Sequence, residues 1–220
     1  MDHQHLASLV APQLRERSGA VFYSGRQAFT AQANLYLLGL NPGGSPMLQT
    51  DETIGRDLQE WQFGPERWSA YLDRSWRGRS PGTYGIQPRI LHMFDRLGVD
   101  PRDVPASNVI FLRTSSEAAL AGEKPALLAQ CRPVHTAVIE DLKNPTILCL
   151  GSTAGRWVRS LLGAETLAGR LVEDNARKWV SEAHFDDRGR CVVTLTHPGR
   201  VDWRNPASDP TPLVLEMLSR

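Results

Sequence analysis

Residues 35–40 are apolar apart from one glycine, and the chain then turns abruptly in the sequence Asn-Pro-Gly-Gly at 41–44. A strand that is apolar on both faces is typical of a parallel sheet covered by helices on each side. In such folds ligand sites form where strands end, so an amide in this turn is a candidate site residue. A second apolar strand ends likewise in His-Pro-Gly-Arg at 197–200. We therefore expect Asn41 and His197 to lie on opposite sides of one site.

Hydrophobic periodicity predicts strands alternating with helices along one domain, residues 1–220. We expect a three-layer α/β/α sandwich with a short, mainly parallel central sheet. The stretch 41–81 is irregular and rich in Trp and Arg, and segments of this length are usually functional or carry short helices. The predicted strands are 33–40, 107–112, 145–150 and 191–196, and the predicted helices are 5–17, 86–97, 127–142, 151–162 and 211–219.

Composition restricts the classes of function. The formal net charge of +1 gives no overall attraction to nucleic acid, so contacts with a polyanion must come from local clusters of arginine. The three cysteines form no CxxC pair, and we predict no zinc site, no disulfide framework and no cofactor. No apolar stretch is long enough to cross a membrane, and the N-terminus does not resemble a signal peptide. We expect a soluble, cytoplasmic monomer, with His92, His135 and His184 solvated.

Four motifs, in order, resemble those of the uracil-DNA glycosylase superfamily, and the resemblance spans roughly residues 35–205. Gly-Leu-Asn-Pro-Gly at 39–43 resembles the first motif of the mismatch-specific and single-strand-selective branches. Asn-Val-Ile-Phe-Leu-Arg at 108–113 resembles the strand that reads the base edge. The segment 145–151 with Ala154 resembles the strand before the last helices, and His197-Pro198 resembles the second catalytic motif.

The resemblance implies a DNA glycosylase that hydrolyses the N-glycosidic bond of uracil or another deaminated base during base excision repair. Asn41 then positions the attacking water, and His197 donates a hydrogen bond to the base as it becomes anionic. Since an amide cannot accept the proton of the water, we expect slower catalysis than in the branch that carries Asp. The rest of the first motif, Gly39, Leu40, Pro42 and Gly43, is expected to line the base.

Two further residues are candidates for holding the base. The amide of Asn108 offers a donor and an acceptor to the edge of uracil, and cytosine presents the reversed pattern. A residue at the start of a strand can also be only a cap. An extruded base needs an aromatic face, and Tyr84 stands where one branch of the family carries a stacking Phe. Phe63 and Trp61 are rivals for that role, and an aromatic that merely anchors the loop is the alternative.

Basic and aromatic residues alternate within 67–89, which suits a surface that grips phosphates and stacks bases. We assign phosphate contacts to Arg74, Arg77 and Arg79, while some of the tryptophans are expected to pack on the core. In the family, a residue after the second motif enters the gap left by the flipped nucleotide. Here that loop begins with Gly199, and Arg200 or Val201 is the candidate wedge.

The sequence also departs from the family. The cysteines that would hold an iron-sulfur cluster are missing, so no cluster is expected. Gly199 stands where Ser often follows His-Pro, which predicts a looser turn and reduced activity. Asp51 or Glu52 could supply the carboxylate that Asn41 lacks. Two alternatives stay open: a degenerate relative that binds nucleic acid or a nucleotide without cleavage, and an unrelated small-molecule enzyme. Gly43-Gly44 belongs to neither a GxxxxGK[ST] nor a GxGxxG sequence, so a standard phosphate loop is not indicated.

Overall fold

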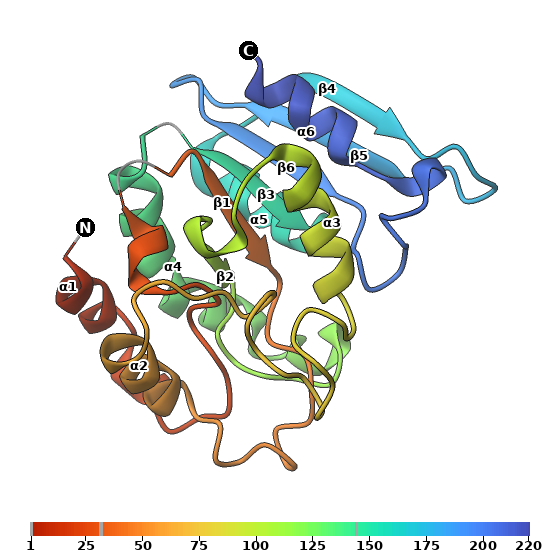
Figure 1. Cartoon of the computed structure of the whole chain (residues 1–220). Coiled ribbons are helices and arrows are strands. Elements are labelled where there is room, and N and C mark those ends of the chain that lie inside the picture. Colours follow the sequence, from red (N-terminus) through yellow and green to blue (C-terminus); the bar gives the residue numbers. More distant parts are fainter. Residues whose placement is uncertain (1, 31–32, 144) are drawn as a thin grey trace.

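The computed structural model describes residues 2–30, 33–143 and 145–220, which form one mixed α/β fold (Figure 1). The helices are α1 (His3–Ser8), α2 (Ile54–Phe63), α3 (Gln87–Leu97), α4 (Lys124–Asp141), α5 (Ser152–Leu162) and α6 (Thr211–Leu218). The strands are β1 (Leu35–Gly39), β2 (Ala106–Asn108), β3 (Thr146–Leu150), β4 (Thr166–Val172), β5 (Val180–Phe185) and β6 (Cys191–Leu195).

The six strands form one sheet in the order β2-β1-β3-β6-β5-β4. The first four are parallel, with Leu37 opposite Ala106 and Leu38 opposite Cys149 in the registers around β1. β5 runs antiparallel to both β6 and β4, so the sheet is mixed, and the expected mainly parallel arrangement holds only for its first four strands. The carboxyl ends of β2, β1, β3 and β6 therefore meet at one edge, which is the lower edge in Figure 1.

Helices cover both faces of the sheet, because the inner strands are apolar on both faces. Tyr36 and Leu38 pack with α1, α2, α4 and α5 on one face. Leu35 and Leu37 pack with α3 and α6 on the other (Figure 1). The predicted three layers are present, and the parallel strands deliver their following loops to the shared edge.

The observed bounds of several helices and strands differ from those predicted. The helix expected at 5–17 stops after Ser8, because Pro12 begins a separate 3-10 turn. β2 spans 106–108, so it includes only 107–108 of the strand expected at 107–112, and Asn108 is its last residue rather than near its start. The irregular stretch 41–81 contains α2, and α3 ends as expected at Gly98 in the left-handed conformation, with φ of 68°.

The expectation of solvated histidines is wrong for His135 and His184, which are both buried. His135 lies between the helix layer and β1, where its Nδ1 is 2.9 Å from the Tyr36 hydroxyl. Burial lowers the pKa of His135 to about 4, so the ring is neutral at physiological pH.

In the part of the chain that the structure describes, no helix is long and apolar enough to cross a membrane.

Candidate functional site

The candidate site lies where the four parallel strands end. Asn41 follows β1, Asn108 ends β2, Gly151 follows β3 and His197 follows β6 by one residue. Because β3 separates β1 from β6, Asn41 and His197 leave the sheet two strand spacings apart, roughly 10 Å. The sheet topology thus brings together the two residues that the sequence places at distant turns.

The Asn41 amide has one orientation that its surroundings permit. Its Nδ2 lies 3.1 Å from the Pro42 carbonyl, 3.2 Å from the Leu112 carbonyl and 2.8 Å from Thr114 Oγ1. The Thr114 hydroxyl donates its own proton to the Ser116 carbonyl, so it can only accept from Asn41. All three partners are therefore acceptors, and they require the NH₂ group on that side. The Asn41 Oδ1 accepts no hydrogen bond from any residue that the structure describes, and it is left as an acceptor at the edge of the sheet.

The His197 ring is held as a hydrogen-bond donor, whereas Asn41 presents an acceptor. The backbone N–H of Gly199 donates to His197 Nδ1 at 2.9 Å, so Nδ1 carries a lone pair and the neutral ring carries its proton on Nε2. Burial, followed by the nearby positive charge of Arg200, lowers the pKa of His197 and favours this neutral form. Nε2–H has no partner within the described residues. The site therefore presents one free acceptor and one free donor.

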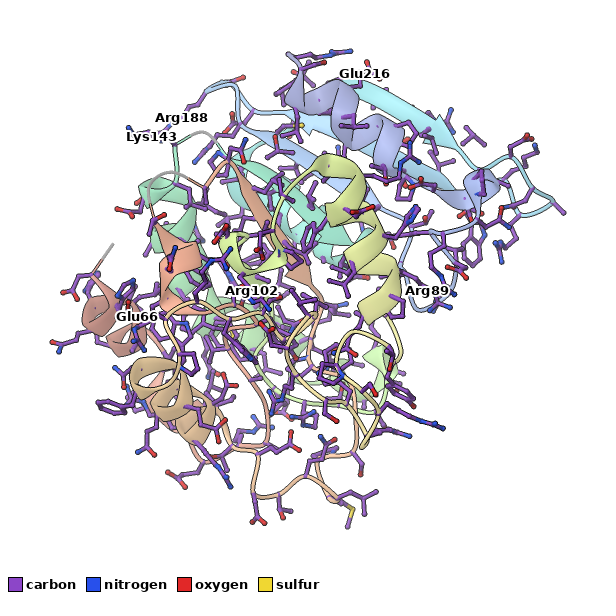
Figure 2. All side chains as sticks on the ribbon, viewed as in Figure 1. Glu66, Arg89, Arg102, Lys143, Arg188 and Glu216 are labelled. Carbon is purple, nitrogen blue, oxygen red and sulfur yellow. The ribbon has the colours of Figure 1, made fainter. Side chains whose placement is uncertain are left out.

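Two side-chain hydrogen bonds hold the turn around His197. Arg89 of α3 donates through Nη1 to the Pro198 carbonyl at 2.8 Å, and Figure 2 shows Arg89 beside this turn. The indole of Trp203, which is fully buried, donates to the Thr196 carbonyl at 3.1 Å. A Cβ at Gly199 would lie 2.9 Å from His197 Nδ1, so glycine permits the close approach of the backbone to the ring. The looser turn expected from this glycine is a wrong prediction: the residue allows a tight contact.

Gly151 forms the part of the edge between the two side chains. Its φ of 95° and ψ of 159° belong to a region that is essentially restricted to glycine. A Cβ there would sit 3.5 Å from the His197 ring, so the ring packs directly over this residue. A glycine at this position thus allows the His197 ring to lie against the backbone after β3. The sequence pattern contained this glycine, but its role follows only from the strand order.

Asn108 lies over Gly39 on the neighbouring strand. A Cβ at position 39 would be 2.2 Å from Asn108 Oδ1, so the side chain rests directly on the glycine backbone. Asn108 is also hydrogen-bonded to the Tyr23 side chain, which lowers the pKa of Tyr23, although burial raises that pKa overall to about 12. Gly39 therefore determines where the Asn108 amide can lie.

Replacing Gly39 with alanine tests this arrangement. The new methyl group must displace Asn108. If the chain has the uracil excision that its sequence resemblance implies, excision should slow and discrimination between uracil and cytosine should weaken. The measurement is the ratio of single-turnover excision rates on the two bases, with thermal melting as a check on folding. Gly122→Ala is the matched control, because a Cβ there meets nothing within 4 Å. An unchanged ratio in Gly39→Ala would exclude Asn108 as the base reader.

The loop after Asn41 is clamped by Arg113, which is buried. Its Nη1 donates to the Gly43 carbonyl at 2.9 Å, and its Nη2 donates to Glu52 at 2.7 Å. Glu52 is thus committed to an ion pair, and it is not the free carboxylate that the sequence suggested near Asn41. Asp51 is exposed at the surface. Within the first motif Pro42 is buried, Leu40 packs partly on the core and Gly43 is exposed.

The three aromatic candidates for base stacking are separated by their burial. Trp61 is buried against Phe22 and Phe29, so it belongs to the core and cannot stack on an extruded base. Phe63 is 86% exposed at the end of α2. Tyr84 is partly exposed, and its backbone N–H and carbonyl both bond Gln87, which holds the turn before α3. Burial therefore excludes Trp61, and Tyr84 and Phe63 remain the stacking candidates.

The arginine-rich stretch separates into paired and unpaired residues. Arg67 forms ion pairs with Asp100 and Asp103, so its charge is already used within the protein. The other three, Arg74, Arg77 and Arg79, have no carboxylate within 4.0 Å among residues 2–30, 33–143 and 145–220. They lie between α2 and α3, in loops that reach the carboxyl edge of the sheet (Figure 1).

Burial also decides between the two wedge candidates. Val201 is 3% exposed and packs in the core cluster with α3 and α6, so its assignment as a wedge is corrected. Gly199 and Arg200 are exposed on the same turn. Arg200 is therefore the member of this loop that a ligand can reach.

Two hollows of the surface lie away from the candidate site. One of about 600 Å³ is lined by α1, α2 and residues 15–16. Another, of about 380 Å³, lies between α4, the end of α5 and the turn at 186–190. Neither includes Asn41, Asn108 or His197.

No model of a known protein family matches the chain, and no curated protein matches its sequence.

Proposed function

We propose that the protein is a monofunctional DNA glycosylase that removes uracil or another deaminated base, on a fold like that of uracil-DNA glycosylases. The observation that carries this proposal is the complementary pair at the sheet edge. Asn41 presents a fixed acceptor, while His197 presents a fixed neutral donor. Glycosidic cleavage needs both, because a water must be oriented toward C1′ and negative charge must be stabilised on the departing base.

In the proposed mechanism, the Asn41 Oδ1 accepts a hydrogen bond from the attacking water and orients it. The His197 Nε2–H donates to the base carbonyl as the N-glycosidic bond breaks and the base becomes an anion. The amide does not remove the proton of the water, so catalysis depends on positioning and on the electrostatics of the donor. Asn108 would supply the paired donor and acceptor that distinguish uracil from cytosine.

The charge distribution supports DNA as the partner. Arg77, Arg79 and Arg200 are exposed and make no ion pair with the described residues, although the net charge is only +1. Arg74 is half-buried, and its charge also acts on Asp57. Arginines on loops at the edge that carries the candidate site can grip phosphates on either side of an extruded nucleotide.

The proposal is tested by incubating the protein with oligonucleotides that contain a single uracil or hypoxanthine, followed by alkaline cleavage of abasic sites. We expect strand cleavage at the modified base only. Binding without cleavage would favour the degenerate relative. The absence of both binding and cleavage would favour a small-molecule enzyme.

Replacing Arg74, Arg77 and Arg79 together with alanine should weaken DNA binding irrespective of sequence. The dependence of log affinity on log salt should flatten by up to about one unit for each phosphate that the variant no longer neutralises. A matched control removes the same charge elsewhere, with Arg132, Arg170 and Arg188 changed to alanine; Figure 2 shows Arg188 far from the loops at the lower edge. Equal salt slopes in the two triple variants would contradict the assignment.

A further inference from the structure

The loop that follows Asn41 ends in a strongly exposed apolar tip. Met47 and Leu48 are 86% and 87% exposed, and both sit in the turn between Ser45 and Gln49. Scattered apolar residues on a surface are ordinary, but two adjacent side chains in full contact with water are a local cost that packing does not relieve. Neither residue belongs to a core cluster among those described.

The tip is presented by an ordered turn. The N–H groups of Leu48 and Gln49 both donate to the Ser45 carbonyl at 3.1 Å, and the Gln49 side chain accepts from Ser45 N–H at 3.2 Å. The base of the loop is fixed through Glu52, which receives hydrogen bonds from Gln49 and from the buried Arg113. The turn is therefore preorganised, and placing its apolar pair against a partner costs little conformational entropy.

The position of the tip indicates its partner. Met47 is the sixth residue after Asn41, so the tip lies within about 20 Å of the site, no more than about six base steps along a DNA strand. The loop 74–79, which carries three arginines, also reaches this end of the molecule (Figure 1). An apolar tip on the loop that follows Asn41, together with arginines and a donor–acceptor pair at this edge, matches DNA, whose phosphates are anionic and whose opened stack exposes apolar base faces.

We propose that Met47 and Leu48 form an apolar wedge that enters the base stack of DNA beside the extruded nucleotide. This inference rests on the proposed function, and it assigns the wedge to the first loop of the site. Arg200, which is charged and exposed, then contacts the phosphates or the opposite strand. Thioether and isobutyl groups fill the space between bases without requiring hydrogen bonds, so insertion is independent of sequence.

The test measures the affinity and the stacking of a duplex that contains a tetrahydrofuran abasic-site analogue next to 2-aminopurine. This duplex has a gap in its base stack, and the analogue carries no base that an enzyme could remove. For the double variant Met47→Ala with Leu48→Ala we expect about a tenfold loss of affinity for the analogue duplex and a smaller loss for undamaged duplex. The change in 2-aminopurine fluorescence that the wild type causes on binding should be lost as well. The salt slope should stay unchanged, because an apolar contact releases no counterions.

Two variants serve as controls. Leu167→Ala with Leu215→Ala removes two exposed leucines from β4 and α6 and should bind as the wild type does. Met47→Leu with Leu48→Met keeps the apolar volume and should retain the signal. Thermal melting of each variant establishes that it is folded.

The outcomes separate this inference from the proposed function. If the wild type excises uracil but the alanine pair binds the analogue duplex equally well, the wedge is excluded and the glycosylase stands. If the wild type binds no DNA, both are excluded. Wild-type binding to anionic vesicles, or a wild-type dimer that the alanine pair dissociates, would assign the tip to a membrane or to a second copy and overturn the wedge.

Discussion

Replacing His197 with alanine is expected to slow uracil release on the order of a hundredfold or more, because the Nε2–H donor of the candidate site is removed. The ring occupies space over Gly151 without being central to the core, so the fold should remain intact. Single-turnover excision rates measure the effect, and thermal melting checks the fold. His5→Ala, an exposed histidine in α1, is the matched control and should behave as the wild type does.

The pH dependence gives an independent test of the state of His197. Its pKa is lowered in the folded protein, so the ring stays neutral as the pH falls through the ordinary range for histidine. Protonation at Nδ1 would place a proton against the Gly199 N–H and break that hydrogen bond. The excision rate should therefore fall only at a pH below the usual pKa of histidine. A rate that rises as the pH falls would show that the imidazolium is the active form.

Replacing Asn41 with alanine should lower excision to a similar extent, on the order of a hundredfold, because no acceptor remains to orient the water. The three acceptors that surround Nδ2 would also be left without their donor, so a modest loss of thermal stability is expected. Asn34→Ala, at the opposite end of the same strand, is the control. Full activity in Asn41→Ala would remove Asn41 from the site.

The variant Asn41→Asp separates positioning from base catalysis. A carboxylate there would face the carbonyls of Pro42 and Leu112 without a proton to donate. We therefore expect lower stability and no gain in rate, although aspartate could in principle accept the proton of the water. A faster Asn41→Asp enzyme would contradict the fixed orientation of the amide.

Sequence periodicity predicted the elements that position the site, because the inner strands β1, β3 and β6 are largely buried on both faces. Periodicity did not predict the hairpin of β4 and β5. β4 is largely exposed and contains Gly169, so its apolar and polar residues alternate only weakly. The strand expected at 107–112 has Asn108 near its start, whereas Asn108 is the last residue of β2, and its contact with Gly39 follows only from the register of the sheet.

The details of the site depend on partners distant in sequence. Thr114 orients the Asn41 amide across 73 residues, and Arg89 holds the His197 turn across 109 residues from Pro198. No local pattern indicates such pairs. Val201 was a candidate wedge because it follows Arg200, whereas its apolar character was a sign of core packing.

The central claim is that this edge releases a base from DNA, and the most direct measurement is the amount of free uracil released from a uracil-containing oligonucleotide. Mass spectrometry of the released base identifies it without relying on strand cleavage. We expect the wild type to release uracil in a single turnover, and the Asn41→Ala and His197→Ala variants to release almost none at equal DNA occupancy. Wild-type protein that binds the oligonucleotide fully and releases no free base would contradict the account.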